Sequence, residues 1–211
     1  MKKMLSLILA GVFILSFTAC DDDDDEQNLL QIAQSRSELS SLALVIAFID
    51  ENSTVSEEAP LSEVLSGPIP SLTVFLPNDA AFAELDQNED NVFNQDDLDL
   101  ISSNSSDQIL ADALYTLITN HTASTRITSD ELSDGQELVT LASAAEGGSN
   151  FGLTIEIDGS SILIVPSNTE FTGAIVTADL SASNGVVHIV DRVLIDNASA
   201  IALGLNSIGI P

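Results

Sequence analysis

Residues 73–82 read TVFLPNDAAF, and this stretch decides how the centre of the chain folds. Its first four residues are β-branched or apolar, which is typical of a buried strand, and we predict a strand over 72–76. Pro77 ends the strand because proline has no backbone N–H to donate. Asn78 is a good helix cap, and the alanines that follow it, with Phe82, can begin a helix. The stretch therefore predicts a strand that is followed at once by a helix.

A second stretch, residues 184–194, reads NGVVHIVDRVL and predicts the last strand of the chain. Its Asn-Gly pair is typical of a tight turn, because both residues accept a positive φ. We expect the strand to cover 186–195 after this turn. Alternation along a strand then places Val187, Ile189 and Val193 on one face.

Helical patterns occupy most of the chain before and between these two stretches. Apolar residues recur at helical spacing over 29–50, and a short helix that follows is expected to stop at Gly67. Ser106 can cap a longer helix. The predicted apolar stripe of that helix is Ile109, Leu110, Ala113, Leu114, Leu117 and Ile118.

The second half of the chain changes to short runs of β-branched residues, which predict strands. These runs are 137–141, 153–157, 161–165 and 173–177. Asp158 and Gly159 lie between two of them and indicate a hairpin, because its turn needs a positive φ. Helices that precede the strands, rather than alternate with them, favour an α+β domain.

The two quoted stretches resemble the first and second signatures of fasciclin-like domains. LITNH at 117–121 is similar to the middle motif of that family, and the resemblance runs from about 29 to 197. It implies an α+β fold in which helices flank a β-sandwich or wedge, and a role in adhesion or extracellular binding. The family-motif positions in this chain are Thr73, Phe75, Pro77, Asn78, Phe82, His121, Asn184, Gly185, His188 and Asp191.

The motif residues are expected to be mostly structural. His121 and His188 have apolar neighbours, and a histidine in that setting is more often a hydrogen-bonded core group than a ligand. In animal relatives a Tyr-His pair in the middle motif has been tied to integrin binding. Asn120 precedes His121 here, so that role does not carry over. Asp191 is expected to pair with Arg192, either locally or across strands.

Residues 86–97, DQNEDNVFNQDD, match a calcium-loop template outside the family motifs and resemble the calcium loops of dockerins. Alternate side chains of such a loop converge on one cation, which takes six to eight oxygens. Asn91 stands where the template has glycine, and asparagine is the best substitute where φ is positive. Phe93 is expected to pack the loop against the core. The candidate ligands are Asp86, Asn88, Asp90, the Val92 carbonyl, Asn94 and Asp97.

The alternative for residues 86–97 is an ordinary acidic surface loop, since acids are abundant in this chain. If Ca²⁺ binds, a single unpaired loop favours a structural ion over a sensor, with an affinity of about 10⁻⁴–10⁻³ M.

The N-terminus is typical of a secretory signal. Two lysines are followed by an apolar run and then by Thr-Ala-Cys, and this run is too short to span a bilayer. The pattern resembles a bacterial lipobox in which Cys20, the only cysteine, is lipidated. We predict a signal peptide at 1–19, a lipidated Cys20 with an acidic tether at 20–27, one domain at 28–197 and a tail at 198–211.

The acidic run at 21–26 extends the chain by charge repulsion, which is typical of a solvated tether. It also resembles the surface-export signal of many Bacteroidetes lipoproteins, so we expect a lipid-anchored protein of the outer membrane that faces the cell surface. The formal net charge is −28, which disfavours nucleic acid as a partner. The expected partners are the membrane, through the Cys20 lipid, and an extracellular protein or polysaccharide.

Sequence motifs for catalysis are absent: there is no G-x-S-x-G elbow, phosphate-binding loop, dinucleotide glycine pattern or H-E-x-x-H. We therefore expect a non-catalytic binding or adhesion module of the envelope. Two alternatives stay open. One is a calcium-stabilised structural component without a specific partner, and the other is a hydrolase whose groups meet only in space.

Overall fold

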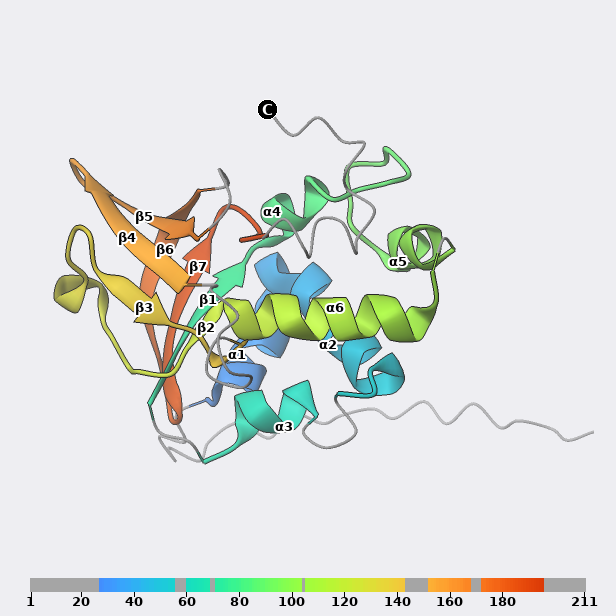
Figure 1. Cartoon of the computed structure of the whole chain (residues 1–211), viewed down its shortest axis with the longest axis horizontal. Coiled ribbons are helices and arrows are strands. Elements are labelled where there is room, and N and C mark those ends of the chain that lie inside the picture. Colours follow the sequence, from blue (N-terminus) through green and yellow to red (C-terminus); the bar gives the residue numbers. More distant parts are fainter. Residues whose placement is uncertain are drawn as a thin grey trace, which may run out of the picture.

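The computed structural model describes residues 27–55, 60–68, 71–103, 105–142, 152–167 and 172–195. Within these residues, a group of helices covers one side of a seven-stranded sheet (Figure 1). The strand order is β2-β1-β7-β6-β5-β4-β3. The predicted α+β class is confirmed. The predicted signal peptide, Cys20, the acidic run and the tail lie outside the described residues.

The elements have the following bounds. The helices are α1 (Leu29–Ser35), η1 (Ser37–Leu39), α2 (Ser40–Asn52), α3 (Leu61–Ser66), α4 (Asp79–Ala83), α5 (Gln95–Ser102), α6 (Asp107–Asn120) and η2 (Ser129–Glu131). The strands are β1 (Leu72–Pro77), β2 (Thr122–Ala123), β3 (Glu137–Val139), β4 (Gly152–Asp158), β5 (Ser161–Pro166), β6 (Gly173–Ala182) and β7 (Gly185–Val190).

The predicted helical region at 29–50 is not continuous. Arg36 has an extended backbone, with φ −98° and ψ 125°, and the helical segments on either side of it are bent by 101°. The bend lets the apolar residues of both α1 and α2 reach the same core. No single helix in the described part of the chain is long and apolar enough to cross a membrane; α1 and α2 reach that length and hydropathy only as a bent pair.

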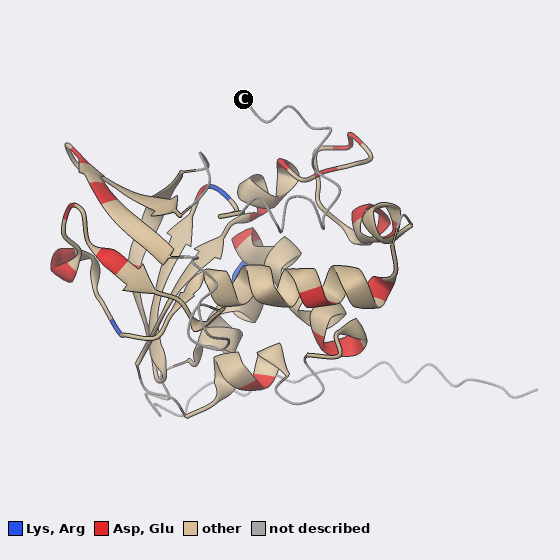
Figure 2. Ribbon diagram, in the orientation of Figure 1, with Lys and Arg blue, Asp and Glu red and all other residues tan. Residues whose placement is uncertain are grey.

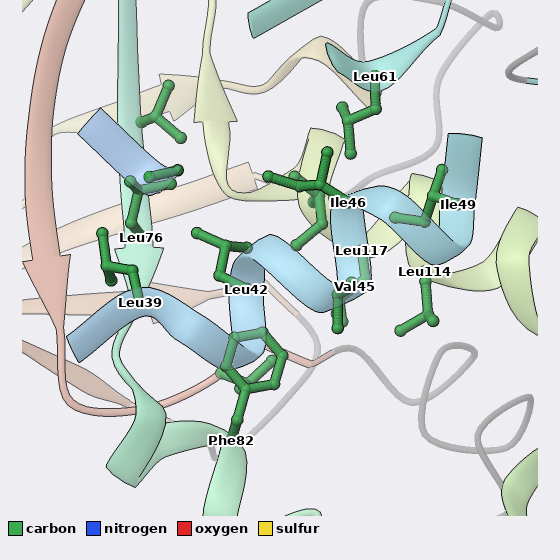
Figure 3. Packing of buried hydrophobic residues seen from close by; sticks show 14 of the residues in the cluster. Leu39, Leu42, Val45, Ile46, Ile49, Leu61, Leu76, Phe82, Leu114 and Leu117 are labelled. Carbon is green, nitrogen blue, oxygen red and sulfur yellow. The ribbon is translucent and has the colours of Figure 1, made fainter. Parts of the chain in front are cut away.

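The main core lies between the helices and one face of the sheet. The apolar residues Leu42, Val45, Ile46 and Ile49 of α2 are buried here, and residues of α3, β1 and α6 pack around them (Figure 3). On α6 the predicted stripe is wrong at one end: Ile109 is 55% exposed, whereas Ala111 is fully buried. Leu110, Leu114, Leu117 and Ile118 of the predicted stripe are buried in this core.

The strands β1 and β7 form the centre of the sheet and run parallel, with Val74 opposite Val187 and Phe75 opposite His188. Val74 and Val187 belong to the helix-side core, and Phe75 belongs to a second core on the opposite face. Both strands are buried along their whole length. Such continuous burial is expected for parallel strands that are covered on both faces.

The second core forms because the sheet curls. The first residues of β6 pair with β5, and the rest of β6 pairs with β7 across two register shifts. The edge strands approach each other, since Ala123 at the end of β2 bridges Thr140 just beyond β3. The curl encloses a core with members on β1, β3, β4, β5 and β7, which gives the expected wedge of strands.

The strands differ from the predicted ranges by one or two residues at several ends, and by more at the ends of β6 and β7. The last strand ends at Val190 rather than 195, because its parallel neighbour β1 ends at Pro77 opposite Val190. Strand β6 is longer than predicted and continues to Ala182. The predicted hairpin is confirmed: Gly159 has φ +62° and Asp158 pairs with Ser161.

Gly185 tests the close approach of β1 and β7. A Cβ atom added there would lie 2.4 Å from the carbonyl oxygen of Leu72, a backbone atom that cannot rotate away. We predict that Gly185→Ala lowers the free energy of unfolding by about 3 kcal/mol, the upper end for an overpacked site. Urea denaturation measures this loss.

The matched control is Gly152→Ala, whose added Cβ would meet the flexible Ser167 hydroxyl at 3.3 Å. This control is expected to cost under about 1 kcal/mol. Equal losses in the two variants would contradict the close approach.

Candidate functional site

His121 caps the C-terminus of α6 and is fully buried. The backbone N–H of Leu194 donates to its Nε2 (2.8 Å), so Nε2 carries no proton. Its Nδ1 lies 2.7 Å from the carbonyl oxygen of Leu117 and therefore donates to it. These bonds tie α6 to the segment that follows β7. Burial lowers the pKa of His121 to about 4, although its bond to Leu117 opposes this.

His188 on β7 is also fully buried, and it uses the opposite tautomer. The backbone N–H of Asp179 donates to its Nδ1 (3.3 Å), and its Nε2 donates to the carbonyl oxygen of Ile127 (3.0 Å). Its ring stacks on Phe75, with ring centroids 5.5 Å apart. Burial lowers the pKa of His188, while the bond to Ile127 and the charge of Asp179 oppose this. Both histidines are hydrogen-bonded core groups, as predicted.

Asn184 is the third buried polar group of the motifs. Its Oδ1 accepts the backbone N–H of Leu29 (2.9 Å). Its amide nitrogen donates to the carbonyl oxygens of Leu65 (2.9 Å) and Gly67 (3.0 Å). One side chain therefore joins the start of α1 and the end of α3 to the turn before β7.

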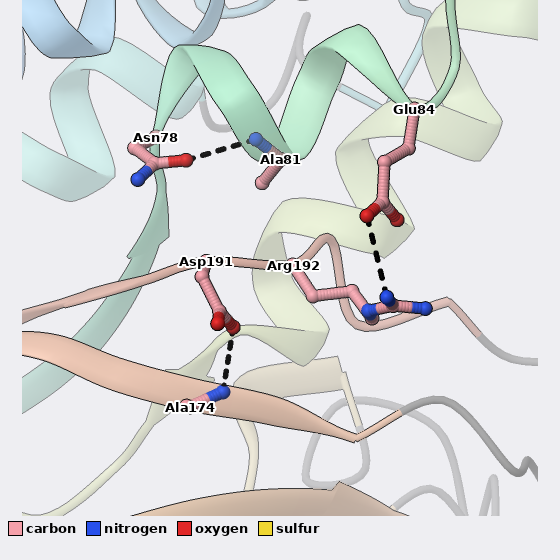
Figure 4. A network of polar contacts seen from close by, with 6 residues as sticks. All are labelled: Asn78, Ala81, Glu84, Ala174, Asp191 and Arg192. Carbon is pink, nitrogen blue, oxygen red and sulfur yellow. Dashed lines mark hydrogen bonds and ion pairs between the residues drawn. The ribbon is translucent and has the colours of Figure 1, made fainter.

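Two further polar motif residues, Asn78 and Asp191, act where β1 and β7 end (Figure 4). Asn78 caps α4 by accepting the backbone N–H of Ala81 (2.8 Å), as predicted. Asp191 accepts the backbone N–H of Ala174 (2.7 Å). The predicted pairing of Asp191 with Arg192 is wrong: Arg192 reaches Glu84 instead, at 3.3 Å. Glu84 lies far away in sequence, so no local pattern marks it as the partner.

Thr73 completes the buried motif set. Its hydroxyl donates to the carbonyl oxygen of Thr125 (2.6 Å) and accepts the backbone N–H of Ile127 (2.8 Å). Pro77 ends β1, while Phe75 and Phe82 are fully buried. The structure thus places every motif residue in the framework.

The loop at 86–97 is built from side chains that accept nearby backbone N–H groups. Asp86 accepts from Asn88, Glu89 and Asn91 at 2.6–2.9 Å. Asn88 accepts from Asp90, and Asp90 accepts from Val92. Partial desolvation raises the pKa of Asp86, but the backbone bonds outweigh it and hold this pKa below its usual value. Asn91 has φ +66°, the conformation that the template needs at this position.

Two candidate ligands of this loop are engaged differently from the template. Asp97 is fully buried, and its oxygens accept the backbone N–H groups of Gln87 and Asn94. The Asn94 amide nitrogen donates to the Asp90 carboxylate (3.2 Å) and the Val92 carbonyl (3.1 Å). A cation would have to displace this amide from oxygens that the template assigns to the ion. No group of three or more His, Cys, Asp or Glu side chains in the described residues is arranged to hold a metal.

Phe93 anchors the loop as predicted. It is 3% exposed and contacts Phe82 with ring centroids 5.5 Å apart. Its carbonyl oxygen also accepts the hydroxyl of Ser41 at the start of α2 (3.2 Å). The loop is therefore fixed to the helical core, although most of its polar residues are exposed.

Three further acids fasten distant segments, and the sequence did not single them out. Asp79 accepts the backbone N–H of Ser41 (2.8 Å). Asp112 and Asp179 accept those of Thr54 (3.0 Å) and Ser129 (2.7 Å). Burial raises the pKa of Asp112 and Asp179, but these and other hydrogen bonds outweigh it and lower both. Among thirty-three acids, no local signal distinguishes such structural ones.

The surface is acidic over the helices and the hairpin tips (Figure 2). A hollow of about 450 Å³ lies between α2, α5 and the start of α6. Its lining combines the apolar Leu44, Ala47 and Phe48 with the acids Glu51, Asp99 and Asp107. Neither ion pair that the described residues form, Arg36–Glu38 and Arg192–Glu84, involves these acids.

The low pKa of His121 predicts a pH-dependent stability. Between about pH 6.5 and 4 the unfolded histidine takes up a proton that the folded one does not, so stability falls on acidification. The slope is about 1.4 kcal/mol per pH unit, or about 3 kcal/mol in all. In His121→Gln this slope is absent, and the stability advantage of the native chain over the variant shrinks by that amount from pH 7 to 4. Urea titrations at each pH measure it; a constant advantage would contradict a neutral, buried His121.

Comparisons with known proteins agree with this arrangement. A family model described as "Fasciclin domain" matches residues 50–196. A solved structure described as "Novel Fold Revealed by the Structure of a FAS1 Domain Pair from the Insect Cell Adhesion Molecule Fasciclin I" is similar in fold, with 16% identity and a TM-score of 0.55. The similarity covers 82% of this chain and 52% of that one, so this chain spans about half the length of the domain pair. A search of the curated proteins found no match. Since the family model covers well over half of the sequence, the chain belongs to the fasciclin domain family.

Proposed function

We propose that this chain is a non-catalytic adhesion module, anchored by lipid to the outer membrane of a bacterial cell. The observation that carries this proposal is the use of both histidines as framework groups. Each ring nitrogen of His121 and His188 is bonded to the backbone, so neither ring is free to act as a general base. The family membership and the adhesion molecule named for the similar structure support the same function.

The proposed anchor is Cys20, followed by the acidic run at 21–26 as a tether to the surface. The first described residues suit a point of attachment. The carbonyl oxygen of Gln27 accepts the backbone N–H of Ser183 (3.0 Å), and Leu29 donates to Asn184 (2.9 Å). A pull on the tether would therefore reach the turn before β7, and so the centre of the sheet. This arrangement suits a domain that holds a partner against force.

The anchor is tested with Cys20→Ser and with a second variant in which residues 21–25 are changed from Asp to Asn. We expect the native chain to incorporate an alkyne-labelled fatty acid, to be removed from intact cells by added protease, and to support attachment to the extracellular polysaccharide of those cells. Cys20→Ser should lose the label and the attachment, because an untethered domain cannot hold a cell.

The Asn variant is the matched control for surface export: it should keep the label but resist protease on intact cells. Attachment that survives Cys20→Ser would contradict the proposal. If the native chain is lipidated but cells that lack the chain attach as well as cells that carry it, the adhesion proposal fails and a structural envelope component is favoured.

We also propose that the loop at 86–97 binds Ca²⁺, with ligands from Asp86, Asn88, Asp90, Asn94, Asp97 and the Val92 carbonyl. The positive φ of Asn91 supports this proposal. The amide of Asn94 and the backbone bonds of Asp97 compete with the ion, so we expect weak affinity, about 10⁻⁴–10⁻³ M.

Calorimetric titration with CaCl₂ tests this proposal. The native chain should release heat that is lost in Asp86→Ala, Asp90→Ala. The matched control, Asp130→Ala, Asp134→Ala, removes two acids from another exposed region and should leave the heat unchanged. Identical heats for the loop variant and the native chain would end the calcium proposal without affecting the adhesion proposal.

A further inference from the structure

An open groove of about 390 Å³ lies where the start of α2, the exposed side of α4 and the acidic loop meet. Ala80 and Ala83 of α4 and Val92 of the loop give it an apolar lining. Val92 is 57% exposed, although it neighbours the buried Phe93. Asp79 is the one acid among its lining residues, and its oxygens already accept the hydroxyl of Ser40 (2.6 Å) and the backbone N–H of Ser41 (2.8 Å). The groove therefore offers apolar surface with little free charge.

The described chain ends close to this groove. Arg192 pairs with Glu84, which follows Ala83 directly and lies four residues, about one helical turn, after Ala80 (Figure 4). Val193 and Ile195 then pack into the helix-side core, which also contains Phe82. The described chain ends at Ile195, three residues after this contact of Arg192 with Glu84. An extended chain covers about 3.3 Å per residue, so fifteen residues can easily cross a neighbouring helix.

The chemistry of residues 197–211 matches the groove. The sequence NASAIALGLNSIGIP has no charged side chain, in a chain whose net charge is −28. Its large apolar residues are Ile201, Leu203, Leu205, Ile208 and Ile210. The first three of these alternate with smaller residues, so an extended backbone would present them on one face. An acidic segment would be repelled by the nearby acids of α4 and the loop. The uncharged segment 197–211 is not repelled by them.

We propose that residues 197–211 dock in the groove between α2, α4 and the acidic loop of the same molecule. Docking covers Val92 and the two alanines of α4. The anchoring and adhesion proposals do not enter this inference.

Hydrogen exchange on the full-length chain tests the inference. Leu203→Asp, Leu205→Asp places two charges on the apolar face of the tail. We expect several-fold faster exchange in peptides that cover 79–83 and 91–93, because the tail no longer shields them. Exchange in the hairpin peptide 156–163 should stay unchanged, which shows that the domain remains folded. The matched control, Ser199→Asp, Asn206→Asp, adds the same charge at polar positions and should exchange as the native chain does.

Unchanged exchange at 79–83 and 91–93 in the leucine variant would overturn the inference, as would a change confined to another surface. Protection that disappears on tenfold dilution of the native chain would also overturn it, because a second copy would then be the occupant. If the double variant fails to fold, a chain that ends at Ile195 replaces it. That deletion should give the same local increase at the groove, and no increase would again contradict docking.

Discussion

The parallel pairing of β1 with β7 is the constraint on which the rest of the fold depends. These strands are far apart in sequence and buried on both faces, and they separate the two cores. The contact is close enough that only glycine fits at 185, where a Cβ atom would strike the Leu72 carbonyl. The elements around the pair are then fastened to it by buried polar side chains: Asn184 holds α1 and α3, and His121 holds α6.

Ionised side chains lie mainly outside this centre, because burial disfavours the charged form of a side chain. The two histidines in the interior are neutral, because both ring nitrogens of each have backbone partners and burial lowers their pKa. Most of the acids in the described residues are exposed, whereas Asp97 is fully buried and accepts backbone N–H groups. Several of these acids fasten loops to helices, so part of the negative charge contributes to structure as well as to the field outside the protein.

The sequence predicted the parts of the fold that local patterns determine. The strand before Pro77, the cap at Asn78, the hairpin at Gly159 and the core histidines are all confirmed, because neighbouring residues suffice to set them. Features set by distant partners were missed or wrong. The bend at Arg36 was not predicted, because the helical spacing of apolar residues continues through this position. Likewise, the end of β7 depends on where β1 ends, and the partner of Arg192 comes from α4.

The candidate site shows the same division. Spacing predicted the positive φ of Asn91 and the anchoring role of Phe93, both of which follow from local geometry. Spacing could not predict that Asp97 turns inward to the backbone or that the Asn94 amide bridges Asp90 and Val92. Calcium binding therefore stays a prediction, as do the lipid anchor and the surface location.

The central claim is that the motif side chains serve the framework and leave the outer surface to bind partners. Long-range ¹H–¹⁵N NMR of the imidazole rings at pH 7 tests it most directly. The structure predicts two neutral rings with opposite tautomers, the proton on Nδ1 of His121 and on Nε2 of His188. A charged ring, or a ring whose tautomer exchanges freely, would contradict the claim and return that histidine to the candidates for chemistry.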